Sequence, residues 1–249
     1  MSLYGIKRKI FSAVNPFIGV RGVKLKNSVV IHQNKSIKVI LSGLTRPSTN
    51  VKTGDMLQVS ILAAATDPVQ AKRLGLDTAN CGNCAIKREC YVNIGQMPLQ
   101  IYRATYNMQP MWPVPLPPDK PIRLGAYGDP AFIPLNILHV LTHKRRYTGY
   151  THQWRHIDRK YSRYLMASID KLSGNIEQQI QDCTALGYRY FRISDKNQDL
   201  RKNEIVCPYY SHGVQCAQCG LCNGSGKAKN ITVAVHGSGS KSYQNTIPK

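Results

Sequence analysis

The pattern of apolar and polar positions divides the chain into an irregular first half and a regularly alternating second half. Residues 37–41 alternate between apolar and polar or smaller side chains, which predicts a β-strand. Residues 56–65 are apolar and fit either a strand or a helix. Asp67-Pro68 is a favourable helix start because proline suits the first helical turn. We therefore expect a short helix from there to about Leu74.

From residue 122 onward, strand and helix patterns alternate. The expected strands are residues 122–127, 147–151, 164–169, 188–193, 204–206 and 231–235. The expected helices are residues 134–146, 155–163 and 175–186. Such alternation indicates βα units and a mostly parallel sheet. The predicted fold is α/β, a partial or degenerate βα barrel of about six mostly parallel strands, and an open sheet is the alternative.

The same pattern suggests three segments. Residues 1–35 have no clear period and are expected to form a basic N-terminal arm. Residues 36–121 form an N-terminal portion that ends in an extended connector, because six prolines fall between positions 110 and 121. Residues 122–249 form the βα-repeat portion.

Cysteines add the first chemical signal, because seven of the eight fall into two short clusters. The spacings are C-x2-C-x5-C and C-x8-C-x2-C-x2-C. The members are Cys81, Cys84 and Cys90 in the first cluster, and Cys207, Cys216, Cys219 and Cys222 in the second. A C-x2-C step lets two sulfurs reach one ion, as in zinc and iron–sulfur sites. In a reducing cytosol, clustered cysteines are metal ligands more often than disulfides.

The two clusters differ in the number of ligands they offer. Four thiolates with a Cys-Pro dipeptide suit a [4Fe–4S] cluster, and the same spacing suits a structural zinc site. The first cluster offers three thiolates, so its fourth ligand is a histidine, a residue from elsewhere or a position open to substrate. The eighth cysteine, Cys183, shares a helical stripe with Ile176 and Ile180 and is expected in the core.

Ionisable residues follow the predicted strands of the second half. Because the carboxyl ends of parallel strands meet at one edge of a sheet, we expect these side chains to share a rim with Cys207. The candidate catalytic residues are Asp129, His152, Asp170, Asp195 and His236. Such groups perform acid–base chemistry, and the aspartates could bind a divalent cation such as Mg²⁺. For each aspartate alone, capping of the next helix is the alternative.

The net charge of +21 makes nucleic acid the expected partner. Residues 1–54 hold ten Lys and Arg and no acid, and residues 143–164 mix cations with aromatic side chains. Cations neutralise phosphates and aromatic faces stack on bases. The candidate nucleic-acid contacts are Lys7, Arg8, Lys9, Lys144, Arg145, Arg146, Trp154, Arg155, Arg159 and Lys160. An anionic membrane surface or an acidic protein partner, such as a host protein, is the alternative.

The apolar pattern also bears on where in the cell the protein is expected. Its apolar runs are far shorter than the roughly 20 residues of a membrane helix, so no membrane insertion is expected. The N-terminal residues make a poor secretory signal. We expect a cytoplasmic protein, in the host cytoplasm if the protein is viral.

Several motifs together resemble a family of bacteriophage proteins with two cysteine clusters. The segments are residues 52–58 (KTGDMLQ), 81–84 (CGNC), 90–93 (CYVN), 123–130 (RLGAYGDP), 149–154 (GYTHQW) and 207–208 (CP). The resemblance spans residues from about 36 to 237. It implies a phage-encoded protein and brings no activity with it.

The expected architecture is also similar to that of radical-SAM enzymes, which combine a partial βα barrel with an iron–sulfur cluster. Those enzymes typically carry a C-x3-C-x2-C motif after the first strand, and that motif occurs nowhere in this chain. Chemistry on S-adenosylmethionine is therefore not expected. The C-x2-C-x5-C spacing resembles part of the auxiliary-cluster motifs of some such enzymes.

Two functions are compatible with these features. The first is a phage-encoded, metal-centred enzyme, with iron–sulfur or zinc, that acts on nucleic acid or a nucleotide. The second is a non-enzymatic nucleic-acid-binding phage factor with structural zinc sites. A scaffold that binds an acidic host protein is a third possibility. The two main functions differ in one requirement, because only the enzyme needs the ionisable rim to converge in space.

Overall fold

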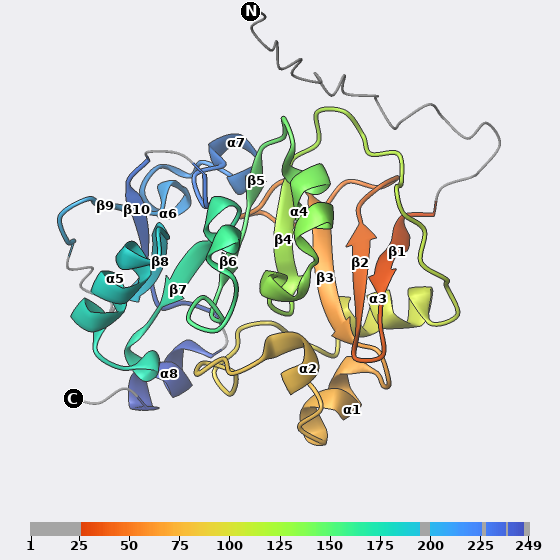
Figure 1. The fold of residues 1–249 in the computed structure, drawn as a ribbon, viewed down its shortest axis with the longest axis horizontal. Helices are drawn as coiled ribbons and strands as arrows, with labels where there is room; N and C mark the ends of the chain where they lie inside the picture. The colour runs from red at the N-terminus through yellow and green to blue at the C-terminus, as the bar shows by residue number, and fades with distance from the viewer. Residues whose placement is uncertain (1–25, 195–199, 226–227, 238, 247–249) are drawn as a thin grey trace, which may run out of the picture.

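Two five-stranded sheets form the centre of the molecule (Figure 1). The computed structural model describes residues 26–194, 200–225, 228–237 and 239–246. Sheet A has the order β1 (Ser28–Gln33), β2 (Ile37–Ser42), β3 (Leu57–Ala63), β4 (Ile122–Tyr127) and β5 (Tyr147–Thr148). Sheet B has the order β6 (Tyr150–Thr151), β7 (Met166–Ile169), β8 (Tyr190–Ser194), β10 (Asn230–Ala234) and β9 (Glu204–Val206).

The strand pairing is mostly parallel. Within the described part of the chain, only the β1–β2 and β2–β3 pairs are antiparallel, and the other six pairs are parallel. The prediction of a mixed α/β fold with a mostly parallel sheet is therefore confirmed. The strands of the described residues form two sheets and no closed barrel.

Eight α-helices are assigned among the described residues. They are α1 (Pro68–Arg73), α2 (Thr78–Cys81), α3 (Met97–Thr105), α4 (Leu135–Thr142), α5 (Ile176–Ala185), α6 (Pro208–His212), α7 (Cys216–Cys219) and α8 (Ser240–Thr246). Three 3₁₀ turns are η1 (Pro130–Phe132), η2 (Arg159–Arg163) and η3 (Lys171–Ser173). None of the helices in the described ranges is long and apolar enough to cross a membrane.

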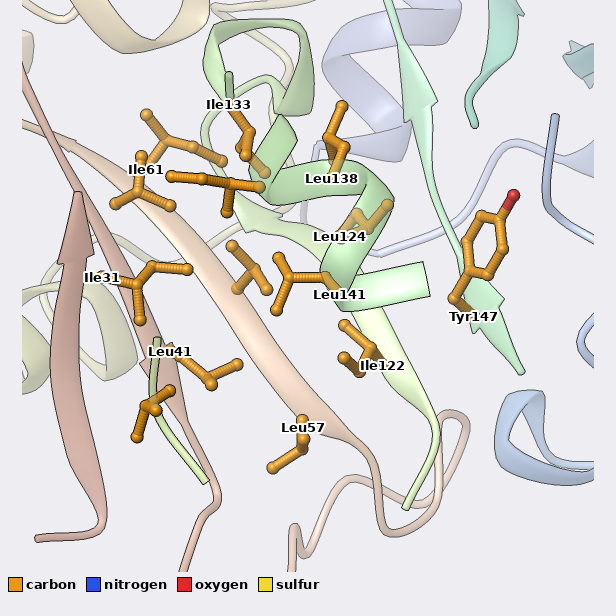
Figure 2. Packing of buried hydrophobic residues seen from close by; sticks show 14 of the residues in the cluster. Ile31, Leu41, Leu57, Ile61, Ile122, Leu124, Ile133, Leu138, Leu141 and Tyr147 are labelled. Atoms are coloured by element: carbon orange, nitrogen blue, oxygen red, sulfur yellow. The ribbon is translucent and has the colours of Figure 1, made fainter. Parts of the chain in front are cut away.

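Sheet A is apolar on both faces, so its central strands are nearly continuous runs of buried residues. Alternate residues point to opposite faces. Leu57 and Ile61 of β3, with Leu124 of β4, pack under α4, which crosses in front of β4 in Figure 1 and is seen from close by in Figure 2. Leu62 and Tyr127 lie in a second cluster against α3.

Sheet B also has two different faces. Ala167 and Ile169 of β7 pack against α5 together with Cys183, so the predicted core position of this cysteine is confirmed. The opposite face carries Phe191 and Val233 and is covered by the loops that hold the C-terminal cysteines.

The two sheets meet between β5 and β6, which are separated in the chain by Gly149 alone. The predicted strand 147–151 is present but divided here, because β5 pairs with β4 and β6 pairs with β7. A Cβ on Gly149 would lie 2.9 Å from the Leu165 side chain and 3.0 Å from that of Leu124, so a larger residue at this junction would force these side chains to shift. Its N–H donates to the carbonyl of Cys222 at 2.7 Å, which ties a cysteine loop to the junction.

Two predictions about elements need correction. Residues 28–33 of the expected basic arm form β1, whose apolar centre is buried. Residues 1–25 of that arm lie outside the described residues. The helix predicted at residues 155–163 is only the 3₁₀ turn η2, in which Asp158 caps the turn by accepting from the N–H of Lys160. The strands on either side of the proline-rich connector, β3 and β4, pair directly with each other.

Candidate functional site

One cavity of about 370 Å³ brings the two cysteine clusters together. It lies against the sheet faces that α4 and α5 leave uncovered, since Tyr127, Phe191 and Val233 form part of its wall. Six cysteines line it, namely Cys81, Cys84, Cys90, Cys207, Cys216 and Cys222. The ionisable side chains that line the cavity include Lys52, Arg123, Asp129, His152 and His236. The volume lies within the usual range for small-molecule sites.

The first cysteine loop is held against the end of β6. Gly82 has a φ of 58°, a conformation that favours glycine, and a Cβ there would lie 2.5 Å from the side chain of Gln153. The Gln153 amide donates to the carbonyl of Cys81 and accepts from the N–H of Asn83, each at 3.2 Å. One side chain therefore fixes the backbone of the C-x2-C step.

Burial controls the chemistry of the first three thiols. It raises the pKa of Cys81 to about 12, and the carboxylate of Asp77 adds to this effect. Burial also raises the pKa of Cys84 and of Cys90. Thiols in such a site stay protonated at neutral pH unless a cation takes the place of the proton.

The C-terminal cysteine loop is held by main-chain hydrogen bonds to three other segments. Cys207 follows β9, and its N–H donates to a carbonyl of β10 at 2.9 Å. The N–H of Cys216 donates to the carbonyl of Lys52 at 3.1 Å, and the carbonyl of Cys222 accepts from Gly149. The loop is thus fixed to both sheets and to the segment before β3.

The four C-terminal thiols influence one another. Burial raises the pKa of Cys222, and charges on Cys207, Cys216 and Cys219 raise it further. Cys219 itself does not line the cavity. Burial also raises the pKa of Cys216 and of Cys219, and a bound cation stabilises the thiolate form of thiols that resist ionising.

Metal coordination is not preformed among the described residues. In that part of the chain, no three His, Cys, Asp or Glu side chains are grouped closely enough to hold a metal ion. The predicted iron–sulfur or zinc centres therefore remain predictions.

Asp129 and His152 form a pair between the ends of β4 and β6. The Asp129 carboxylate accepts from the N–H of Ala131 at 2.9 Å and from the N–H of His152 at 2.8 Å. Burial raises the pKa of Asp129, although His152 opposes this. His152 Nδ1 lies 3.9 Å from the carboxylate, and its buried Nε2 has no hydrogen-bond partner among the described residues. The imidazole therefore has one nitrogen for a ligand or substrate.

His236 lies just beyond β10 and is paired with Lys52. Its Nδ1 is 2.9 Å from the carbonyl of Ala234, and its Nε2 is 3.3 Å from the Lys52 ammonium. The carbonyl can only accept and the ammonium can only donate, so the neutral Nδ1–H tautomer satisfies both contacts. Burial and the Lys52 charge lower the pKa of His236. The ring stays neutral at physiological pH.

Lys52 and Arg123 were not among the predicted site residues. Arg123 lies in β4 between buried Ile122 and Leu124, so alternation directs it to the opposite face, where it lines the cavity. Its Nη2 donates to the hydroxyl of Tyr91 at 2.8 Å. A cation inside an apolar strand is the sequence signal that could have identified Arg123, whereas Lys52 offers no local signal.

One predicted catalytic residue, Asp170, does not line this cavity. It follows the end of β7 as predicted, but it is fully buried and caps η3 by accepting from the N–H and the hydroxyl of Ser173, at 2.9 and 2.8 Å. The contacts of Asp170 are therefore those of a structural cap. Asp195 lies outside the described residues. The predicted convergence therefore holds for Asp129, His152 and His236.

The predicted nucleic-acid stretch is partly built into the fold. Trp154 is 1% exposed and its Nε1 donates to the carbonyl of Ser168, so it is a core residue and offers no face to a base. Arg145 donates to the carbonyls of Pro117 and Lys120 at 2.7 and 2.5 Å. Trp154 therefore packs in the core, and Arg145 holds the loop that contains Pro117 and Lys120.

The remaining cations of the stretch lie on the surface. Arg146 donates to the carbonyl of Gln218 at 3.0 Å, and Arg155 stacks on Trp154 and lies 3.6 Å from Asp182. The exposed side chains are Lys144, Arg146, Arg155, Arg159 and Lys160. Lys7, Arg8 and Lys9 lie outside the described residues.

No family model, curated protein or solved structure matches this chain. The function is therefore argued from the geometry of the site.

Proposed function

We propose that this chain is a metal-centred enzyme whose active site is the cavity between the two cysteine clusters. One observation supports this most strongly: six cysteines and three of the predicted rim residues line the same cavity. These residues come from segments up to 155 positions apart in the chain, from Cys81 to His236. A structural zinc site normally closes on its own four ligands. Thiols that face a shared cavity favour centres that take part in chemistry.

The donor sets fit this proposal. The C-terminal cluster offers four thiols, the complement of a [4Fe–4S] cluster, and its members already influence one another electrostatically. The first cluster offers three thiols and leaves one position for a further ligand. Loading would require the thiol side chains to turn toward a common centre while their loops stay fixed by Gln153 and Gly149.

The chain's own polar groups supply acid–base chemistry beside these centres. Iron–sulfur centres, when bound, supply electron transfer, and zinc supplies a Lewis acid. Asp129 holds the main chain of His152, whose Nε2 is available to exchange a proton with a bound molecule. Neutral His236 can accept a hydrogen bond where Lys52 now donates.

The proposed substrate is a nucleotide or one nucleotide of a nucleic acid. A net charge of +21 favours phosphate-bearing partners. A cavity of about 370 Å³ accommodates a small molecule or a single flipped nucleotide and excludes a duplex. In this proposal the two sheets act together as a degenerate half-barrel of a phage-encoded enzyme, with the substrate on its concave face.

A binding factor with structural zinc sites is the second candidate function. The exposed cations Lys144, Arg159 and Lys160 favour it, because phosphate contacts need only surface charge. In that case the cavity would have no role.

Absorption and metal analysis of anaerobically purified protein tests the proposal. We expect a brown protein that absorbs near 400 nm and contains iron and acid-labile sulfide. Cys183→Ala is the matched control. Cys183 lies on the buried face of α5, away from the cavity thiols, so its substitution should leave the spectrum unchanged. A colourless protein that holds only zinc would favour the binding factor.

A further inference from the structure

Lys52 is held at the cavity and has no carboxylate partner among the described residues. Its Nζ is 3.2 Å from the hydroxyl of Tyr210 and lies 4.5 Å above the centre of that ring. The backbone around Lys52 is fixed, because its carbonyl accepts from Cys216 and the N–H of Thr53 donates to the side chain of Asn50. The ammonium is thus positioned and only partly exposed.

Arg123 reaches the same part of the cavity from β4. Its contact with Tyr91 places it near Lys52, because the Tyr91 ring lies 6.1 Å from the His236 ring and Lys52 contacts His236. Arg123, Tyr91, His236 and Lys52 therefore form a continuous series along one wall.

No acid on the cavity wall neutralises these two cations. Among the described residues, the carboxylates that line the cavity belong to Glu89 and Asp129. Neither forms an ion pair with Lys52 or Arg123. Both oxygens of Asp129 already accept main-chain hydrogen bonds. The wall therefore presents about two positive charges to whatever occupies the cavity.

We propose that Lys52 and Arg123 bind the phosphate group of the substrate. A phosphate monoester carries a charge of about −1.5 to −2 at neutral pH, which matches two unpaired cations better than a carboxylate does. The arginine fork and the lysine point charge are the two side chains that proteins use most for phosphate. This inference rests on the proposed function in taking the cavity as the substrate site.

The two cations contact hydroxyls and an imidazole, and they lie close enough to Cys216 to act on it. Lys52 contacts Tyr210 and His236, and Arg123 interacts with Tyr91 and Tyr150. Both positive charges oppose the rise that burial causes in the pKa of Cys216. None of the hydrogen bonds from these two side chains reaches a sulfur in that part of the chain. Phenol hydroxyls such as that of Tyr210 can also donate to phosphate oxygens, so the same wall is suited to the ester.

Calorimetric titration with three matched probes tests this inference. The probes are thymidine 5′-monophosphate, thymidine, and a short oligothymidylate without terminal phosphates. The proteins are the wild type, Lys52→Gln, Arg123→Gln, Arg123→Lys and the surface control Lys160→Gln. We expect the monophosphate to bind and thymidine not to bind, with a loss of about tenfold or more in Lys52→Gln and Arg123→Gln. Arg123→Lys should keep part of the affinity, and Lys160→Gln should keep all of it.

The outcomes show whether the bound group is a phosphate monoester or a phosphodiester, and they show whether Lys52 and Arg123 bind phosphate at all. If the oligothymidylate binds and depends on Lys52 and Arg123 while the monophosphate does not, the group bound is a phosphodiester. Equal affinities in wild type and in Lys52→Gln, a variant of a turn residue that should fold, would overturn the inference. Metal content of the same samples is measured in parallel. If the protein contains metal but Lys52→Gln and Arg123→Gln bind the monophosphate as wild type does, only this inference is refuted. If the monophosphate binds through these two residues but the protein contains no metal, only the metal-centred function is refuted.

Discussion

The carboxylate of Asp129 accepts a hydrogen bond of 2.8 Å from the main-chain N–H of His152, and so links the turn after β4 to the turn after β6. The same carboxylate accepts from Ala131 at 2.9 Å, and the N–H of Asp129 donates to the carbonyl of Asn80 at 2.7 Å. This residue therefore connects both sheets to the first cysteine loop. Sequence alone treats capping and a place in the site as alternatives for Asp129, but the residue both caps η1 and lines the cavity.

Removing this carboxylate should destabilise the protein. Asp129→Ala leaves one buried and one partly buried N–H group without an acceptor. Each costs about 1–3 kcal/mol, so we expect a loss of about 2–6 kcal/mol in the free energy of unfolding. Asp129→Asn keeps one oxygen and should lose about half as much. Urea unfolding of these variants and of Asp158→Ala, an exposed cap, measures the effect. A loss in Asp129→Ala no larger than in Asp158→Ala would exclude this linking role.

Gly82 and Gln153 should be energetically dependent on each other. Gly82→Ala places a methyl group 2.5 Å from the Gln153 side chain at a φ of 58°, so it should cost about 1 kcal/mol for the backbone and more for the clash. Gln153→Ala removes the clash and two hydrogen bonds. The double variant should be less destabilised than the sum of the single variants. A double-mutant cycle in urea measures this, and additive losses would show that the two residues do not meet.

Metal uptake by the apoprotein should strengthen as pH rises. Burial raises the pKa of Cys81 to about 12, so the folded apoprotein keeps thiol protons that a metal must displace. Zinc affinity should therefore increase by up to about tenfold per pH unit for each displaced proton between pH 6 and 9. The folded apoprotein binds more protons than the unfolded chain above the ordinary thiol pKa, so its stability should fall as pH rises through that value.

Competition with a chelating dye at several pH values measures the zinc affinity. Cys183→Ala should follow the wild-type curve, because Cys183 lies on the buried face of α5. An affinity that does not change with pH would show that the cavity thiols are not the ligands.

Nucleic-acid binding should depend on residues 1–25 and on exposed cations. The first 25 residues hold five Lys and Arg, and removing them leaves β1 intact. If they contact phosphates, the slope of log affinity against log salt should become shallower by up to about 0.9 per lost contact on duplex DNA. Fluorescence anisotropy across a salt series measures this slope. Lys144→Gln should make this slope shallower by the amount expected for about one phosphate contact. If deleting residues 1–25 leaves the slope unchanged, the phosphate contacts lie on the described surface instead.

Elements with local signals were predictable from sequence. Asp67 caps α1 through the N–H groups of Val69 and Gln70, as the Asp-Pro start implied. β4 and β9 have the predicted bounds, because alternation and flanking turns are contained within each segment. Asp129, His152 and His236 were also predictable, since parallel strands bring their carboxyl ends to one edge.

The features that sequence did not predict depend on contacts between distant segments. β1 is buried on both faces, so its residues show no alternation, and its strand exists because it pairs with β2. Trp154 is surrounded by cations in the sequence but donates to Ser168 in the core. The Gln153 contact with the Cys81 loop spans 72 positions, and no local pattern encodes it.

The central claim is that two cysteine groups each hold a metal centre on the wall of one cavity. Iron, zinc and sulfide per chain should be measured in the wild type, Cys84→Ala, Cys222→Ala, the double variant and Cys183→Ala, all purified without oxygen. We predict that each single cavity variant loses one centre and keeps the other, that the double variant loses both, and that Cys183→Ala loses none. Equal metal content in all five proteins would refute the claim.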